Sequence, residues 1–294
     1  MENRMEPQGE WLVVGADGQI GRQLLSRLQA EGRPVAGTTR RDSPGRWHLD
    51  LGGPPEQWEL PDRVAVAYLC AAIASIDKCE SDPAGTRRIN VERTLALAER
   101  LRDRGGHLVF LSTNQVFDGA KPMRSENDAI CPLTEYGRQK AEVEAKLLAG
   151  GRAAIVRFTK VAVPGWKLIG DWAAALGRGE PITAFADMVM APVPAAFAVE
   201  ALTAIGAARA TGIFHVSGER DITYLEVALR LAERIGALRD LVRPVSIVER
   251  KISRAAAPPN TALDAGRLHR EFGLACPPVQ ATLDELFTFG SSRM

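Results

Sequence analysis

The 294-residue sequence carries 37 Lys and Arg residues against 36 Asp and Glu. A chain of this length can bury a substantial core, which excludes a small disulfide scaffold. The balanced charge indicates no nucleic-acid partner and no acidic membrane surface, so we expect a small-molecule ligand.

Targeting and metal-binding patterns are absent from the sequence. Residues 1–10 are polar, and no run of about eighteen apolar residues occurs, so we expect neither export nor a membrane span, and a cytoplasmic protein. The four cysteines contain no Cys-x-x-Cys pair and the four histidines are scattered, so we expect no metal site.

The first two-thirds of the sequence alternates short apolar runs with amphipathic stretches, which predicts βαβ units. The predicted strands are Trp11–Val14, Pro34–Thr38, Trp47–Leu49, Val64–Cys70, His107–Leu111 and Ala153–Phe158. The predicted helices are Gln19–Glu31, Ala84–Arg104 and Glu135–Ala149. We therefore predict an α/β fold with a Rossmann doubly wound parallel sheet, in a nucleotide-binding domain over 1–160.

Beyond Phe158 the alternation loosens and prolines punctuate short elements. This predicts a smaller C-terminal substrate lobe over 161–294. One helix in it is well marked, because Thr223 and Glu226 have the spacing of a capping box ahead of an apolar stripe.

Three glycines, Gly15, Gly18 and Gly21, follow the first strand directly, and the predicted helix begins at Gln19 and Ile20. Glycines at this spacing let the backbone turn tightly and approach a pyrophosphate at a helix N-terminus. An ordinary strand-to-helix turn is the alternative. The context favours a dinucleotide site.

The residues after the second predicted strand bear on the choice of cofactor. A carboxylate there would bind a free 2′-hydroxyl, but the sequence has Thr39, Arg40 and Arg41. Two guanidinium groups can pair with a 2′-phosphate, so NADP(H) is preferred and NAD(H) is possible; alternatively, both arginines face solvent. After the next strand, Asp50 and Leu51 are candidates for adenine contact, although Asp50 could equally be a turn residue.

Tyr136 and Lys140 lie four residues apart in a predicted helix, so their side chains project from one face. A neighbouring ammonium and a nicotinamide cation would lower the pKa of the phenol, which could then exchange a proton with a carbonyl or alcohol oxygen. Ser112 and Thr113 end the strand before, and one of these hydroxyls can orient the substrate oxygen. A surface helix pair is the alternative.

Six stretches resemble the extended short-chain dehydrogenases, and among them the dTDP-4-dehydrorhamnose reductase-like group. They are Gly15–Gly21, Asp77–Pro83, Ser112–Gly119, Pro132–Lys140, Phe185–Pro192 and Pro259–Asp264. The resemblance covers nearly the whole chain in the family's order. It implies reduction of a nucleotide-linked 4-keto-6-deoxy sugar by NAD(P)H, and a return of about 193–217 to the nucleotide-binding core.

The resemblance also implies roles for single residues. Thr113, Tyr136 and Lys140 would be the catalytic trio, with Tyr136 and Lys140 also contacting the cofactor. Ala71 and Ala72 would lie on its nicotinamide side, and Asn90 beside the site, although a buried asparagine bonded to backbone is an equal account. The implied substrate contacts are Gln115, Lys160 and Asn260.

Asn114 and Gln115 stand where the dehydratases of the superfamily need an Asp-Glu pair, and amides cannot transfer protons in that way, so a reductase is favoured. Two alternatives stay open: an epimerase with tightly bound NAD(P), and a catalytically silent NADP-binding regulatory subunit. A homodimer is possible.

Overall fold

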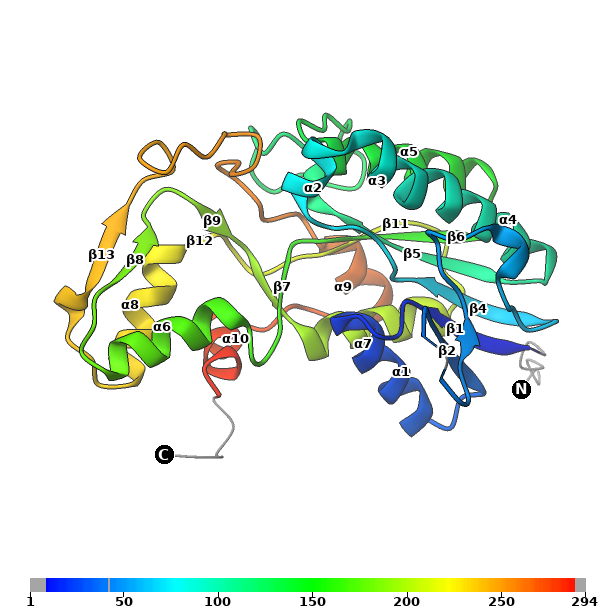
Figure 1. The fold of residues 1–294 in the computed structure, drawn as a ribbon, viewed down its shortest axis with the longest axis horizontal. Helices are drawn as coiled ribbons and strands as arrows, with labels where there is room; N and C mark the ends of the chain where they lie inside the picture. Colours follow the sequence, from blue (N-terminus) through cyan, green and yellow to red (C-terminus); the bar gives the residue numbers. More distant parts are fainter. Residues whose placement is uncertain (1–8, 42, 289–294) are drawn as a thin grey trace. The chain divides into compact units, whose positions relative to one another are not determined.

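The computed structural model describes residues 9–41 and 43–288, so the polar stretch 1–10 lies almost wholly outside the described residues. The chain forms two compact units (Figure 1). As far as their residues are described, the first comprises Met1–Val116, Thr134–Arg157 and Val199–Phe214, and the second comprises Phe117–Leu133, Phe158–Ala198 and His215–Met294. The domain boundary expected between residues 160 and 161 stays a prediction.

A seven-stranded sheet forms the centre of the first unit, in the order β11-β6-β5-β4-β1-β2-β3. Its strands are β1 (Glu10–Val14), β2 (Val35–Thr39), β3 (Trp47–His48), β4 (Val64–Leu69), β5 (His107–Thr113), β6 (Ala153–Phe158) and β11 (Gly212–Val216). Strand β1 pairs in parallel with β2 and β4, and β4 pairs in parallel with β5. The predicted Rossmann sheet is confirmed.

Helices cover both faces of this sheet, which explains why β4 and β5 are buried along their whole length. Helices α4 (Thr94–Asp103) and α5 (Glu135–Ala149) lie over one face, and α1 (Gln19–Ala30) and α7 (Ala195–Ala207) over the other (Figure 1). Helices α1 and α4 present apolar stripes at helical spacing, such as Leu97 and Leu101 on α4.

The helix predicted over 84–104 is interrupted in the structure. It consists of α3 (Pro83–Arg87), a π-helical segment over Arg88–Arg93, and α4, and a further helix, α2 (Ile76–Ser81), precedes it. A π-helical turn contains an extra residue, which the apolar periodicity of the sequence does not reveal. The predicted span of this helix is therefore confirmed, while the π-helical turn inside it was not predicted.

The order of strands reverses beside β1. From β1 the chain proceeds to β2 and β3, and then returns to β4 on the other side of β1. In open α/β sheets, ligands bind outside the carboxyl ends of the strands at such a switch point. The loops that follow β1 and β4 therefore frame the expected site.

As far as its residues are described, the second unit contains three two-stranded sheets and four α-helices. The strand pairs are β7 (Lys160–Ala162) with β10 (Pro192–Pro194), β8 (Ile182–Phe185) with β13 (Val242–Val245), and β9 (Val189–Met190) with β12 (Ile222–Thr223). The helices are α6 (Lys167–Gly177), α8 (Tyr224–Arg234), α9 (Gly266–Phe272) and α10 (Val279–Leu286). The Thr223 hydroxyl accepts the Glu226 N–H at 3.0 Å, which confirms the predicted start of α8.

Candidate active site

A cavity of about 620 Å³ lies in the first unit, lined by the loops that follow β1, β2, β3 and β4. Its volume is in the range of small-molecule and cofactor sites. Nine predicted cofactor residues line it: Gly15, Gly18, Thr39, Arg40, Arg41, Asp50, Leu51, Ala71 and Ala72. Of the other predicted residues, Gln19, Ile20 and Gly21 begin α1, and Tyr136 and Lys140 lie on α5.

The glycine loop leaves no room for side chains at two positions. Gly15 has a φ of +82°, and a Cβ on it would lie 2.9 Å from the backbone nitrogen of Ala71. A Cβ on Gly21 would lie 2.3 Å from the Gly15 carbonyl oxygen. Gly18 is the N-cap of α1 and provides no side-chain cap, so the first N–H groups of this helix are available to an anion.

Replacing Gly21 by alanine is expected to weaken cofactor binding about tenfold and to lower the free energy of unfolding by about 1–3 kcal/mol, because the glycine loop must shift. Nucleotide fluorescence titration and urea unfolding measure the two effects. Gly170 lies on α6, where an added Cβ would meet nothing within 4 Å, so Gly170→Ala is the matched control and is expected to leave binding unchanged. Equal nucleotide affinity in both variants would contradict a close approach at Gly21.

Asp17, which sequence reasoning did not assign, also lines the cavity. Its carboxylate accepts hydrogen bonds from the Thr39 hydroxyl at 2.7 Å and from Arg46 at 2.9 Å. The Thr39 bond and the charge of Arg46 lower the pKa of Asp17. The Thr39 hydroxyl in turn accepts the N–H of Arg41 at 3.1 Å, so the loop after β2 is tied to the glycine loop.

Arg40 and Arg41 are exposed side chains at the cavity wall. Asp50 has a turn role as well as a place in the wall, because its side chain accepts the Gly52 N–H at 2.9 Å and its carbonyl accepts the Trp58 indole N–H at 2.7 Å. Lys78 on α2 lines the cavity too, as a cation that sequence reasoning missed; its place within the Asp77–Pro83 stretch was the available signal.

Helix α5 carries Tyr136 and Lys140, and the Thr134 hydroxyl caps its first turn by accepting the Gly137 N–H. The Lys140 ammonium is buried, donates to the Leu111 carbonyl at 2.8 Å, and lies 5.8 Å from the centre of the Tyr136 ring. The structure thus brings the two side chains together beside the end of β5.

In the chain by itself, burial raises the pKa of the Tyr136 phenol. The lowering expected from Lys140 together with a nicotinamide cation stays a prediction. Burial also lowers the pKa of Lys140 to about 8, and its ammonium is bonded to a carbonyl rather than to the phenol. In this chain by itself, Tyr136 is therefore a neutral phenol that still holds its proton at pH 7.

Ser112 and Thr113 have different surroundings. The Ser112 hydroxyl donates to Glu144 at 2.5 Å, and Glu144 pairs with Arg157 at 2.6 Å; both charged side chains are 2% exposed. The Ser112 hydroxyl is thus already hydrogen-bonded to a buried ion pair. The Thr113 hydroxyl accepts the Gln115 N–H at 3.2 Å and keeps its place at the end of β5, so of the two candidates Thr113 is the better placed to meet a substrate.

Asn90 lies in the π-helical segment and is 2% exposed. Its side chain bonds both main-chain groups of Ile73, which lines the cavity. The buried, backbone-bonded account of this asparagine therefore holds in the structure.

The three expected substrate residues lie in different units. Gln115 is half-buried in the first unit, directly after β5. In the second unit, the Lys160 side chain is exposed, and its ammonium lies 4.5 Å from the centre of the Trp166 ring. The Asn260 amide donates to the Gly119 carbonyl at 2.7 Å, so it holds a loop of its own unit. Their contact with a substrate stays a prediction.

Over residues 9–41 and 43–288, no cluster of three or more His, Cys, Asp or Glu side chains is arranged to hold a metal ion. In the same part of the chain, every helix is too short or too polar to cross a membrane.

The family model described as "RmlD substrate binding domain" matches residues 10–290. A dTDP-4-dehydrorhamnose reductase from Streptomyces griseus is 30% identical over 286 residues, which cover 89% of this chain and 87% of that protein. A solved dTDP-4-dehydrorhamnose reductase from Bacillus anthracis, in complex with NADP, has a TM-score of 0.81 at 23% identity and covers 96% of this chain and 99% of that one. MoeE5 in complex with UDP-glucose and NAD has a TM-score of 0.80 at 23% identity, covering 95% and 97%.

Proposed function

Because this chain belongs to the RmlD substrate binding domain family and is an NAD(P)-dependent oxidoreductase, we propose that it reduces a nucleotide-linked 4-keto-6-deoxy sugar, as a dTDP-4-dehydrorhamnose reductase-like enzyme. The observation that carries the proposal is the cavity at the switch point of the sheet, in the unit that also holds Tyr136 and Lys140. The first relative named above is itself a reductase of this kind.

The residues at the cavity fit a dinucleotide. Gly15 and Gly21 let the backbone approach a pyrophosphate closely, and the uncapped first turn of α1 offers N–H groups to it. Arg40 and Arg41 would hold a 2′-phosphate, while Asp50, Leu51, Ala71 and Ala72 would contact the rest of the cofactor. When bound, the nicotinamide supplies the hydride.

The proposed catalytic roles follow from protonation and position. Tyr136 holds its proton at pH 7 and donates it to the carbonyl oxygen of the keto sugar, because that oxygen becomes an alkoxide as hydride arrives. The Lys140 ammonium stabilises the phenolate that remains. The Thr113 hydroxyl donates a hydrogen bond to the same sugar oxygen and orients it. Gln115, Lys160 and Asn260 are the proposed substrate contacts.

The preference for NADP(H) is tested by replacing both arginines at the cavity wall. Arg40→Ala with Arg41→Ala is expected to raise the KM for NADPH about 10- to 100-fold, because charge-assisted hydrogen bonds to the 2′-phosphate are lost. The KM for NADH is expected to stay within about twofold, because that cofactor lacks the phosphate. Steady-state kinetics with each nucleotide measures both values.

Arg27→Ala is the matched control, since Arg27 lies on α1 in a surface ion pair with Glu31. It is expected to change neither KM. A parallel rise in both KM values in the double variant would contradict recognition of the 2′-phosphate by these arginines.

The proposed reaction itself is tested by NADPH oxidation against a panel of dTDP-, GDP- and UDP-linked 4-keto sugars. Stoichiometric oxidation with one of them supports a reductase. A nucleotide that survives dialysis, together with interconversion of sugar epimers and no net oxidation, would instead indicate an epimerase. A stable complex with a larger enzyme and no turnover of any keto sugar would indicate a regulatory subunit.

A further inference from the structure

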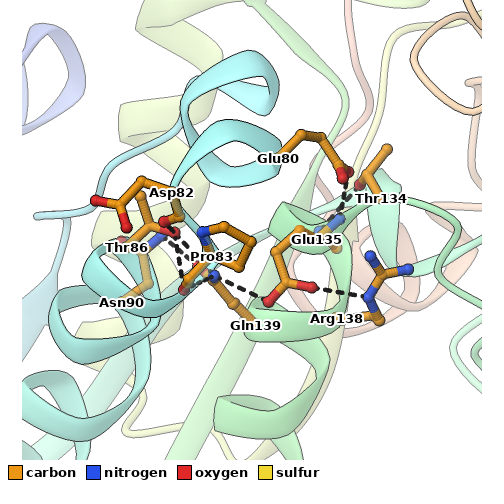
Figure 2. A network of polar contacts seen from close by, with 10 residues as sticks. Glu80, Asp82, Pro83, Thr86, Asn90, Thr134, Glu135, Arg138 and Gln139 are labelled. Atoms are coloured by element: carbon orange, nitrogen blue, oxygen red, sulfur yellow. Dashed lines mark hydrogen bonds and ion pairs between the residues drawn. The ribbon is translucent and has the colours of Figure 1, made fainter.

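A buried glutamine lies between the two proposed catalytic residues of α5. The Gln139 side chain is 2% exposed. Its amide nitrogen lies 3.0 Å from the Thr86 hydroxyl and 3.1 Å from a Glu135 carboxylate oxygen, and it has a longer contact with the Pro83 carbonyl at 3.4 Å. Its amide oxygen accepts a hydrogen bond from Asn90 at 2.9 Å. Donors and acceptor are all used, so the side chain has one orientation (Figure 2).

Asn90 continues this connection to the wall of the cavity. Its amide oxygen accepts the Ile73 N–H at 2.8 Å, and its amide nitrogen donates to the Ile73 carbonyl at 2.9 Å. Ile73 belongs to the irregular stretch Cys70–Ser75, which follows β4 and lines the cavity. Asn90 thus bonds both the N–H and the carbonyl of Ile73, which lies outside any strand or helix that would otherwise pair them.

We propose that Gln139 is a positioning residue: through Asn90, it fixes the helix that carries Tyr136 and Lys140 relative to the cavity wall at Ile73. The inference rests on the proposed function, which assigns the cavity to NAD(P) and the pair to catalysis. Gln139 lies next to Lys140 in the chain and one turn after Tyr136, so a shift of its backbone displaces both.

The energetic consequence of such a shift is larger for catalysis than for folding. Hydride and proton transfer need reacting atoms in a near-attack geometry, and a misplacement of about 1 Å can cost about 100-fold in rate. A single buried hydrogen bond contributes far less to folding. Loss of the Gln139–Asn90 bond should therefore affect turnover and cofactor affinity out of proportion to stability.

The matched pair of variants is Gln139→Met and Thr86→Val. Methionine has a similar length but loses every hydrogen bond of Gln139. Thr86→Val removes a hydroxyl bonded to the same amide nitrogen and leaves the bond to Asn90 in place. If the network only stabilises the fold, both variants should change NADPH affinity and turnover to a similar extent. If Gln139 positions the helix, only Gln139→Met should change them.

The readouts are NADPH affinity without sugar, amide hydrogen exchange of a peptide containing Ile73, turnover, and the unfolding midpoint. Gln139→Met is expected to weaken NADPH binding about three- to tenfold, to speed exchange at Ile73, and to lower kcat about tenfold or more. Thr86→Val is expected to lower the unfolding midpoint only. Equal binding, exchange and turnover in Gln139→Met and the unchanged protein would overturn the proposal, as would equal losses in Thr86→Val.

Gln139→Glu serves as the rescue variant, and as the deciding one if Gln139→Met does not fold. It is made together with Glu135→Gln, so that the new carboxylate does not face a second one; the pair keeps an oxygen that accepts from Asn90 but loses the donor to Thr86. Its NADPH affinity is expected to stay within about twofold of the unchanged protein despite lower stability. A loss of NADPH affinity and of Ile73 protection would overturn the proposal.

Hydrogen exchange needs neither nucleotide nor sugar. It therefore distinguishes a failure of the Gln139 proposal from a failure of the proposed function. A protein that reduces no keto sugar would contradict the proposed function, while altered exchange at Ile73 in Gln139→Met would still support the link.

Discussion

Tyr136→Phe is expected to lower kcat for keto-sugar reduction by about 10²- to 10⁴-fold, the usual contribution of a positioned general acid. Only the hydroxyl is removed, so the ring stays half-buried on α5 beside Lys140. Binding of NADPH is expected to change little, because the glycine loop and the arginines are untouched. Steady-state NADPH oxidation and a fluorescence titration of NADPH measure the two quantities.

Tyr224→Phe is the matched control. Tyr224 belongs to the second unit, where its ring lies 6.3 Å from that of Trp166. We expect this variant to retain full activity. Should Tyr136→Phe keep its ketone-reducing activity with normal cofactor binding, the phenol is not the proton donor.

Glu144→Ala is expected to lower the free energy of unfolding by about 3–5 kcal/mol, the range found when one partner of a buried ion pair is removed. The variant leaves the Arg157 guanidinium 2% exposed and without its carboxylate, and leaves the Ser112 hydroxyl without its acceptor. Urea unfolding followed by circular dichroism gives the free energy.

Glu142→Ala provides the comparison on the same helix. Glu142 pairs with Arg87 at 2.8 Å, but both side chains are about 40% exposed. Solvent screens such a pair, so its loss is expected to cost about 0–1 kcal/mol. A cost below about 1 kcal/mol for Glu144→Ala as well would show that the buried pair adds little to folding.

The sequence predicted the Rossmann sheet because the central strands β4, β5 and β6 are buried on both faces and read as short apolar runs. It could not predict the π-helical turn at Arg88–Arg93, since Asn90 is placed there by hydrogen bonds to distant residues. Periodicity detects burial, and it does not detect side-chain bonds between segments.

The sequence likewise predicted some residues of the candidate site and missed others. Gly15 and Gly18 were found from the spacing of the glycines, and Arg40 and Arg41 from their place after the second strand; all four line one cavity. Ile73 and Ser75 were missed, because they lie in an irregular loop whose place at the cavity is set by tertiary contacts and not by a local sequence pattern. Ser112 and Thr113 could not be told apart, because neighbouring strand residues point to opposite faces and the sequence does not say which face holds Glu144.

The sheet of the first unit is completed late in the chain. Strand β6 is buried along its whole length between β5 and β11, and β11 begins only at Gly212. During synthesis on the ribosome, β6 therefore emerges well before its outer neighbour, as an apolar edge with unpaired main-chain groups. Such edges associate readily with other chains, so the nascent protein has a stage at which a chaperone would be useful until β11 docks.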